Sequence, residues 1–140
     1  MEKPEILLID TTNLYSAIIY HGVEHKILKS GKFLFLTTDV NMGEIVRVVK
    51  RNLDWSDEKI KELIANTPVS AIPSSVYSSK LSEGNDLIGK RDPKDVPLVA
   101  LALRIENDGI CSSDTDFEVV KDRFRIWKGS ELLKFVEEKG

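Results

Sequence analysis

Short apolar runs alternate along the chain with segments in which apolar residues recur every three to four positions. Residues 5–10 are typical of a buried strand that stops at Asp10, and Leu14, Ala17 and Ile18 continue at helical spacing. The same alternation recurs as far as the C-terminus. It predicts further strands at residues 33–36, 69–72, 110–112 and 124–127. Helices are expected to begin at Thr38 or Asp39 and at Ser56, and two more to cover residues 98–105 and 130–138. Residues 74–82 are expected to form a helix plus a loop.

The start of the helix over residues 98–105 can be located from a proline. Pro97 lacks a backbone N–H, which is harmless in the first turn of a helix but deletes a hydrogen bond further inside. With Asp92 as the N-cap, Pro97 would fall past the first turn, whereas with Asp95 as the N-cap it lies within it. We therefore place the boundary at Asp95.

The order of these elements predicts the fold class. Strands that alternate with helices favour a parallel sheet covered by helices on both faces. A chain of 140 residues has the usual size of one domain, and no repeat, low-complexity block or linker interrupts it. We expect an α/β fold in a single domain over residues 1–140.

Composition and charge indicate an ordinary globular protein and argue against some other classes. With 41% hydrophobic and 31% charged residues, the chain resembles ordinary globular proteins. Its single cysteine, Cys111, lies in an apolar context and is expected to be a buried strand residue. The first apolar run is too short for a signal sequence or a membrane span, so we expect a cytoplasmic protein. A formal net charge of −3 argues against a purely electrostatic nucleic-acid binder.

Carboxylates follow the predicted strands at the edge where parallel sheets bind ligands. Asp10 ends the first strand, and Asp114 and Asp116 follow the strand at residues 110–112. Asp95 begins a helix that must pack on this sheet, and Glu44 lies on the helix after the second strand. Oxygen ligands that converge in this way suit Mg²⁺ or Mn²⁺, because the cation offsets their mutual repulsion.

Each of these carboxylates also has a structural interpretation. Asp10 and Asp95 could serve only as helix N-caps, a common position for aspartate. Glu44 could be a solvated charge on a helix surface, and Asp114 and Asp116 could form only a turn after a strand. The individual residues therefore leave both interpretations open.

Taken together, four blocks of sequence resemble PIN-domain proteins in order and spacing, over essentially the whole chain. The blocks are LIDTTNL at residues 8–14, Glu44, DPKDVPLVALA at residues 92–102 and SDTDF at residues 113–117. The resemblance implies a three-layer α/β/α sandwich with a central, mostly parallel sheet. It also implies a metal-dependent nuclease that hydrolyses RNA in single-stranded regions.

The resemblance also implies roles for individual residues. An acidic quartet would hold one or two Mg²⁺ or Mn²⁺ ions, supported by a further carboxylate and by a small polar side chain that holds the quartet or the attacking water. The quartet is Asp10, Glu44, Asp95 and Asp114, the further carboxylate is Asp116, and Thr12 stands where many relatives carry Asn or Ser.

The implied reaction is hydrolysis of an RNA phosphodiester by metal-activated water, without a protein nucleophile. The sequence shows no Ser-His-Asp or Cys-His arrangement, which agrees with this chemistry. Lys90, Arg91 and Lys94 lie near the third block and are expected to contact substrate phosphates. Arg47 and Lys50, on the helix of Glu44, could do the same.

Three functions remain open. The leading one is an endoribonuclease, in the VapC-type case the toxin of a toxin–antitoxin pair, with an antitoxin covering the acidic pocket and a homodimer expected by analogy. A haloacid-dehalogenase-like phosphohydrolase also places Asp after its first strand, but it requires a second Asp where Thr12 stands. A catalytically silent PIN-type scaffold for RNA processing should lack part of the quartet, which this chain keeps.

Other conspicuous residues have structural interpretations. His21 and His25 are four apart, yet a glycine between them weakens the helix that would align them and no third zinc ligand is near. Basic residues at alternating positions over 121–128 predict a solvated edge strand. Trp55 and Trp127 are expected to be packing or interface residues.

Overall fold

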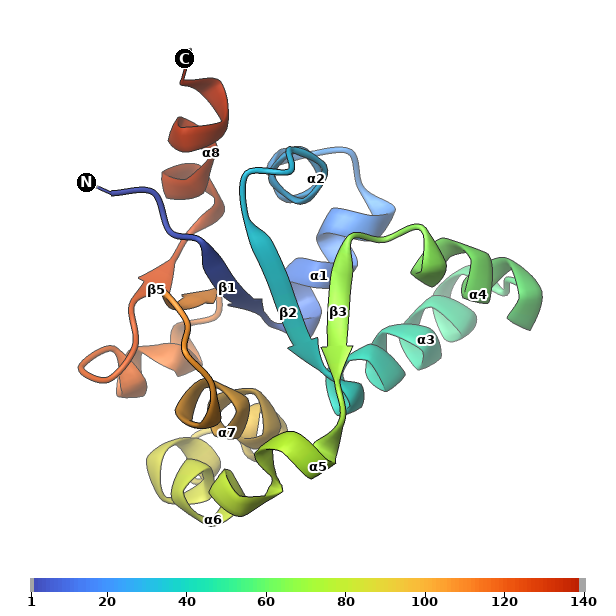
Figure 1. Ribbon diagram of the computed structural model, residues 1–140. Helices are drawn as coiled ribbons and strands as arrows, with labels where there is room; N and C mark the ends of the chain where they lie inside the picture. The colour runs from blue at the N-terminus through green and yellow to red at the C-terminus, as the bar shows by residue number, and fades with distance from the viewer. Residues whose placement is uncertain (1, 139–140) are drawn as a thin grey trace.

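A parallel sheet between two layers of helices forms the computed structural model, which describes residues 2–138 (Figure 1). The order of its five strands is β3-β2-β1-β4-β5, and every neighbouring pair is parallel. The predicted three-layer α/β fold is confirmed. The strands are β1 (Ile6–Ile9), β2 (Leu34–Thr38), β3 (Val69–Ile72), β4 (Ile110–Cys111) and β5 (Ile126–Trp127).

Helices fill every connection between consecutive strands. The first two connections hold α1 (Thr11–Ile19), α2 (Val23–Lys29), α3 (Asp39–Leu53) and α4 (Asp57–Ala65). The third holds α5 (Ser74–Tyr77), η1 (Ser78–Lys80), α6 (Leu81–Gly84), the π-helical turn η2 (Asn85–Gly89), η3 (Pro93–Asp95) and α7 (Val96–Arg104). The short η4 (Thr115–Val120) joins β4 to β5, and α8 (Gly129–Glu137) follows the last strand.

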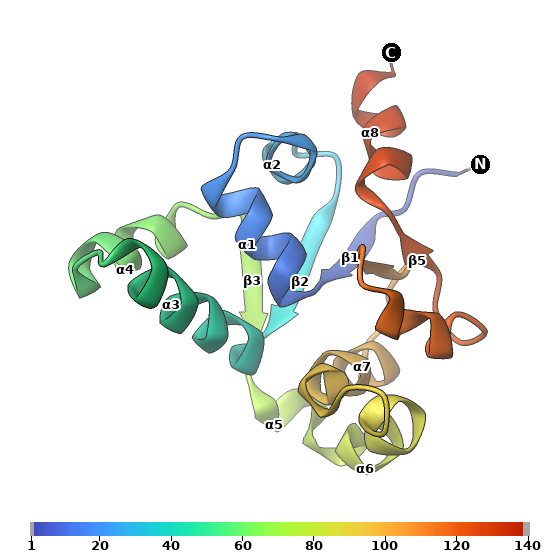
Figure 2. The ribbon, with the colours of Figure 1, turned by 180° about the vertical axis from the view of Figure 1, so that it is seen from behind.

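Alternation along β1 divides the core between the two faces of the sheet. Leu7 and Ile9 belong to an apolar cluster that includes side chains of α1, α2, α3 and α8, whereas Leu8 packs in a second cluster built largely by α7. Figure 2 shows α1 and α3 in front of the sheet on the first of these faces. All three β1 side chains are at most 2% exposed, the environment expected for a central parallel strand.

The helices that follow β1 and β2 begin directly at the strand ends. Asp10 Oδ1 accepts a hydrogen bond from the Asn13 backbone N–H (2.9 Å), and Thr38 Oγ1 accepts one from that of Asn41 (3.0 Å). Asn41 Nδ2 also donates to Thr11 Oγ1 (2.9 Å), which links the two helix starts. At this polar edge of the sheet, α1 and α3 therefore start without an intervening long loop, and side-chain hydrogen bonds fix where they begin.

Several element boundaries differ from the sequence prediction. The prediction missed α2, whose N-cap Gly22 provides no side-chain hydrogen bond. Residues 74–89 form a series of short helical turns, because a tertiary contact sets their path: a Cβ at Gly84 would lie 3.2 Å from the carbonyl oxygen of Val96. Strand β5 begins two residues later than expected. The predicted boundary at Asp95 is confirmed, with Pro97 in the first turn of α7.

The predicted packing roles of the cysteine and the tryptophans are confirmed. Cys111 is a free thiol, 2% exposed in the core. The Trp127 ring is buried and its Nε1 donates to the Asp108 carbonyl oxygen (2.8 Å). Trp55 is half-buried beneath the ammonium group of Lys59. No helix among residues 2–138 is long and apolar enough to cross a membrane.

Gly109, just before β4, leaves no room for a side chain. Its φ is +130°, and a Cβ would lie 2.3 Å from the Arg125 carbonyl oxygen. Gly109→Ala should therefore lower the free energy of unfolding by about 2–4 kcal/mol, measured by denaturant titration. Gly31→Ala is the matched control, since Gly31 also has positive φ but open space around it. Equal losses at the two positions would contradict the steric argument.

Candidate metal centre

A polar cavity of about 210 Å³ opens at the carboxyl ends of β1 and β4. Five of its eight lining residues are carboxylates, and one is a cation. The lining residues are Asp10, Thr11, Thr12, Glu44, Asp92, Lys94, Asp95 and Asp114. The four carboxylates of the predicted quartet thus face one cavity, although they come from four separate parts of the chain.

A tighter group of carboxylates forms one wall of this region. Asp92, Asp95, Asp114 and Asp116 each place one oxygen so that all four oxygens lie within 4.8 Å of one another. Asp10 and Glu44 line the cavity but are outside this group. The group therefore overlaps the predicted quartet only at Asp95 and Asp114.

Asp92 is the candidate ligand that the sequence interpretation missed. The sequence offers it only as a possible helix cap, and its Oδ1 accepts a hydrogen bond from the Lys94 backbone N–H (3.0 Å) at the start of η3. A carboxylate has several acceptor positions, so capping a turn leaves one free for a cation. Because the role of a helix cap already explains an aspartate at this position, the sequence gives no separate indication that Asp92 can also bind a metal.

Asp10 is a buried carboxylate that is held in one orientation. It is 3% exposed, and Oδ2 accepts a hydrogen bond from Ser112 Oγ (2.5 Å) while Oδ1 accepts one from Asn13. Burial raises its pKa from 3.8 to about 6. The two hydrogen bonds oppose that rise, and the negative charge of Asp114 adds to it. Asp10 is therefore held in one orientation, and with a pKa of about 6 its protonation state changes close to neutral pH.

Asp95 gives the strongest indication that the cavity suits a cation. It occupies the N-cap position of α7 without making a side-chain cap hydrogen bond, and its buried Oδ2 has no hydrogen-bond partner among residues 2–138. Burial raises its pKa from 3.8 to about 7, and neighbouring negative charges, Asp92 first, add to the rise. An unpartnered carboxylate oxygen among like charges fits a hard divalent cation.

The cavity lies within the part of the chain that matches a known family. The PIN domain family model matches residues 8–127, from β1 to β5. The chain belongs to the PIN domain family. No curated protein gives a significant match. Because PIN domains are generally nucleases that use divalent metals, membership supports a nuclease over a haloacid-dehalogenase-like enzyme and supports a metal at the acidic cavity.

In this PIN domain, Ser112 links the side chain of Asp10 to the backbone of Asp114. Its hydroxyl donates to Asp10 and accepts a hydrogen bond from the Asp114 backbone N–H (3.0 Å). Asn13 acts in parallel, because its Oδ1 accepts from both the backbone N–H (3.2 Å) and the hydroxyl (3.1 Å) of Ser113. The sequence pattern gave no sign of these two roles beyond polar residues at the ends of strands.

The basic residues predicted to contact substrate lie in different surroundings. Lys94 lines the cavity. Arg91 Nε donates to Asp116 Oδ1 (2.8 Å), so its charge is directed into the carboxylate group. Lys90 is exposed and does not line the cavity. Thr12 is exposed and lines the cavity.

The histidine pair does not form a metal site in the described structure. The rings of His21 and His25 have centroids 4.4 Å apart, and His25 Nδ1 lies 2.9 Å from the Ala17 carbonyl oxygen. No third ligand joins them among residues 2–138. The pair instead covers the junction between α1 and α2.

Proposed function

We propose that this PIN domain is a metal-dependent endoribonuclease that hydrolyses single-stranded RNA at the acidic cavity. The observation that carries the proposal is the convergence of four carboxylates within 4.8 Å at the carboxyl end of a parallel sheet, in a chain of a nuclease family. The chain is proposed to act as one domain. The chain also keeps all four carboxylates of the predicted quartet, Asp10, Glu44, Asp95 and Asp114, which argues against a silent scaffold.

The proposed ligands of Mg²⁺ or Mn²⁺ combine the predicted set with the residue found in the structure. They are Asp10, Glu44, Asp95 and Asp114, supported by Asp116 and Asp92. When bound, the cation would supply Lewis-acid activation of water and positive charge for the phosphate. Ser112 and Asn13 hold the carboxylates in place, Thr12 at the rim can hydrogen-bond water, and Lys94 can bind a substrate phosphate.

Protons should compete with the metal at this site. The raised pKa values of Asp10, about 6, and Asp95, about 7, mean that both carboxyls are largely protonated in the metal-free protein at about pH 5. Mn²⁺ affinity should therefore rise about tenfold per pH unit for each proton released, and level off above about pH 8. Calorimetric titration in buffers of different ionisation enthalpy measures both quantities. A constant affinity over this range, without proton release, would contradict the prediction.

Removal of the Ser112 hydroxyl should weaken the metal site without unfolding the protein. Ser112→Ala breaks the link between Asp10 and Asp114 and should lower Mn²⁺ affinity about 10–100-fold. Ser113→Ala is the matched control, because the Ser113 backbone N–H still donates to Asn13 after the change. Similar Mn²⁺ affinities for the two variants would show that Ser112 does not position the site.

Analysis of the product ends tests the proposed reaction. Attack by water needs no ribose 2′-hydroxyl, so an RNA with a single 2′-deoxynucleotide at the cleaved position should still be cut. Oxygen from ¹⁸O-labelled water should enter the product phosphate, and no cyclic phosphate should form. A 2′,3′-cyclic phosphate, with loss of cleavage at the deoxy position, would mean internal attack and would overturn the hydrolytic proposal.

We also propose, from the resemblance to VapC-type proteins, that the chain is a cytoplasmic toxin that forms a homodimer and is silenced by an antitoxin. The open acidic cavity could accept a cationic side chain from such a partner. A neighbouring gene for a short DNA-binding protein, and its co-purification with this chain, would support the toxin role. A purified chain that is monomeric and has no such neighbour would favour a role in general RNA processing.

A further inference from the structure

A second groove, of about 420 Å³, continues from the acidic cavity along α3. It shares Glu44 and Lys94 with that cavity, so the two depressions are adjoining. One wall is a stripe of α3 in which Val40, Glu44, Arg47 and Arg51 recur at helical spacing. The opposite wall is the η3 turn and the start of α7, with Lys94.

Within residues 2–138, the cations of this groove have no carboxylate partner. Arg47, Arg51 and Lys94 are exposed, and none forms an ion pair within residues 2–138. Two neighbouring cations differ in this respect: Lys50 pairs with Asp57 (2.8 Å), and Arg91 pairs with Asp116 (2.8 Å). Three unpaired positive charges therefore line one groove of a chain whose formal net charge is −3.

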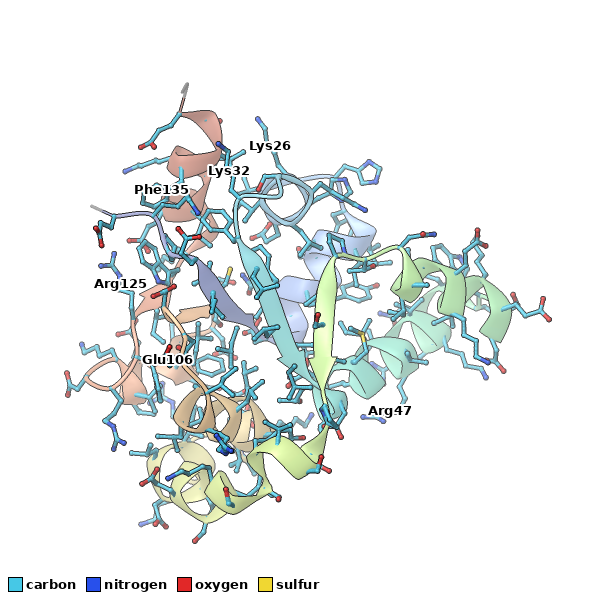
Figure 3. The ribbon with its side chains drawn as sticks, in the orientation of Figure 1. Lys26, Lys32, Arg47, Glu106, Arg125 and Phe135 are labelled. Carbon is cyan, nitrogen blue, oxygen red and sulfur yellow. The ribbon has the colours of Figure 1, made fainter. Side chains whose placement is uncertain are left out.

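The arrangement of the two arginines suits a repeating anion. They lie one helical turn apart, a rise of about 6 Å, which is comparable with the step between successive phosphates of an extended nucleic-acid strand. Figure 3 shows Arg47 below α3, at the level of the carboxyl ends of β2 and β3. Guanidinium groups bind phosphate oxygens in a bidentate manner, which favours phosphate over a diffuse attraction.

We propose that this groove binds the sugar–phosphate backbone of the RNA strand next to the phosphate that is cut, with Arg47 and Arg51 on successive phosphates. The inference rests on the proposed function for the position of the cleaved phosphate. Val40, 47% exposed, gives the groove an apolar surface for a sugar or a base edge. No aromatic side chain from the described part of the chain lines the groove, so the groove binds the strand with little dependence on sequence.

Salt-dependent RNA binding tests the groove separately from cleavage. Anisotropy of a fluorescent single-stranded RNA would be measured in EDTA, for the wild type and for the double variant Arg47→Ala/Arg51→Ala. Loss of two phosphate contacts should reduce the slope of log affinity against log salt concentration by about 1.4. Lys50→Ala is the matched control, because it removes one positive charge from the same helix outside the groove. It should leave the slope within about 0.3 of the wild-type value.

The outcomes separate this inference from the proposed function. A reduced slope for the double variant supports the groove, whether or not the wild type cleaves RNA with Mn²⁺. A double variant that matches Lys50→Ala in slope and affinity overturns the groove, even where the wild type cleaves. A wild type that neither binds nor cleaves RNA overturns both. Thermal unfolding of each variant checks that the fold is intact, which is the expected result because the changed positions are exposed.

Discussion

Asp114→Asn should lower kcat/KM for metal-dependent RNA cleavage by more than about 100-fold. Asp114 belongs both to the predicted quartet and to the group of oxygens within 4.8 Å, so the change removes a negative charge where the proposed cation binds. Loss of a residue that only supports a metal ligand already costs about 10–100-fold, and loss of a ligand charge should cost more.

The fold should survive this substitution. Asparagine has the shape of aspartate and keeps a side-chain oxygen that can accept the hydrogen bond from the Asp116 backbone N–H (2.8 Å). The matched control is Asp57→Asn, which neutralises an exposed carboxylate on α4 outside the cavity. Initial rates on a labelled single-stranded RNA give the comparison. A loss of less than about tenfold, or a similar loss in the control, would remove Asp114 from the proposed site.

Asp95→Asn should stabilise the metal-free protein at about pH 8 and abolish its stabilisation by metal. Because folding raises the Asp95 pKa from 3.8 to about 7, the folded state holds this proton more tightly than the unfolded chain. The wild type therefore loses stability as pH rises from about 4 to about 7, and the loss is complete above that range. Since Asp95 is only partly buried, the penalty is about 1–2 kcal/mol.

Thermal unfolding at two pH values tests this prediction. In EDTA at about pH 8 the variant should unfold at a higher temperature than the wild type. At about pH 3, below both pKa values, Asp95 is mostly protonated in the folded and the unfolded state, and the difference should nearly vanish. Mn²⁺ at about 100 times its dissociation constant should stabilise the wild type by about 2.7 kcal/mol, and the variant much less. A variant that is less stable at both pH values, or equally stabilised by Mn²⁺, would contradict the assignment.

Much of the fold was predictable because its central strands β1 and β4 are buried on both faces. Continuous apolar runs such as residues 6–9 identify such strands, and the caps Asp10 and Thr38 mark where the following helices begin. The turns over residues 74–89 were not predictable, because the close approach of Gly84 to α7 is set by packing rather than by local periodicity.

The candidate site was predictable only in part, for a related reason. Carboxylates at the ends of strands can be found because topology brings those ends to one edge. Asp92 was hidden because its role as a cap already explained its presence. Ser112 bonds to Asp10 across 102 positions of sequence, so no local pattern could reveal it. The unpaired state of Arg47 likewise depends on which carboxylates the fold places nearby.

Cleavage of a mixed-sequence single-stranded RNA by the purified protein, with Mn²⁺ or Mg²⁺, tests the central claim most directly. Parallel reactions would contain EDTA in place of the metal, or the Asp10→Asn variant in place of the wild type. We predict cleavage that requires the metal and is lost in both controls. Absence of cleavage with either metal, in protein shown to be folded and free of a bound inhibitor, would contradict the claim and favour a silent RNA-binding module.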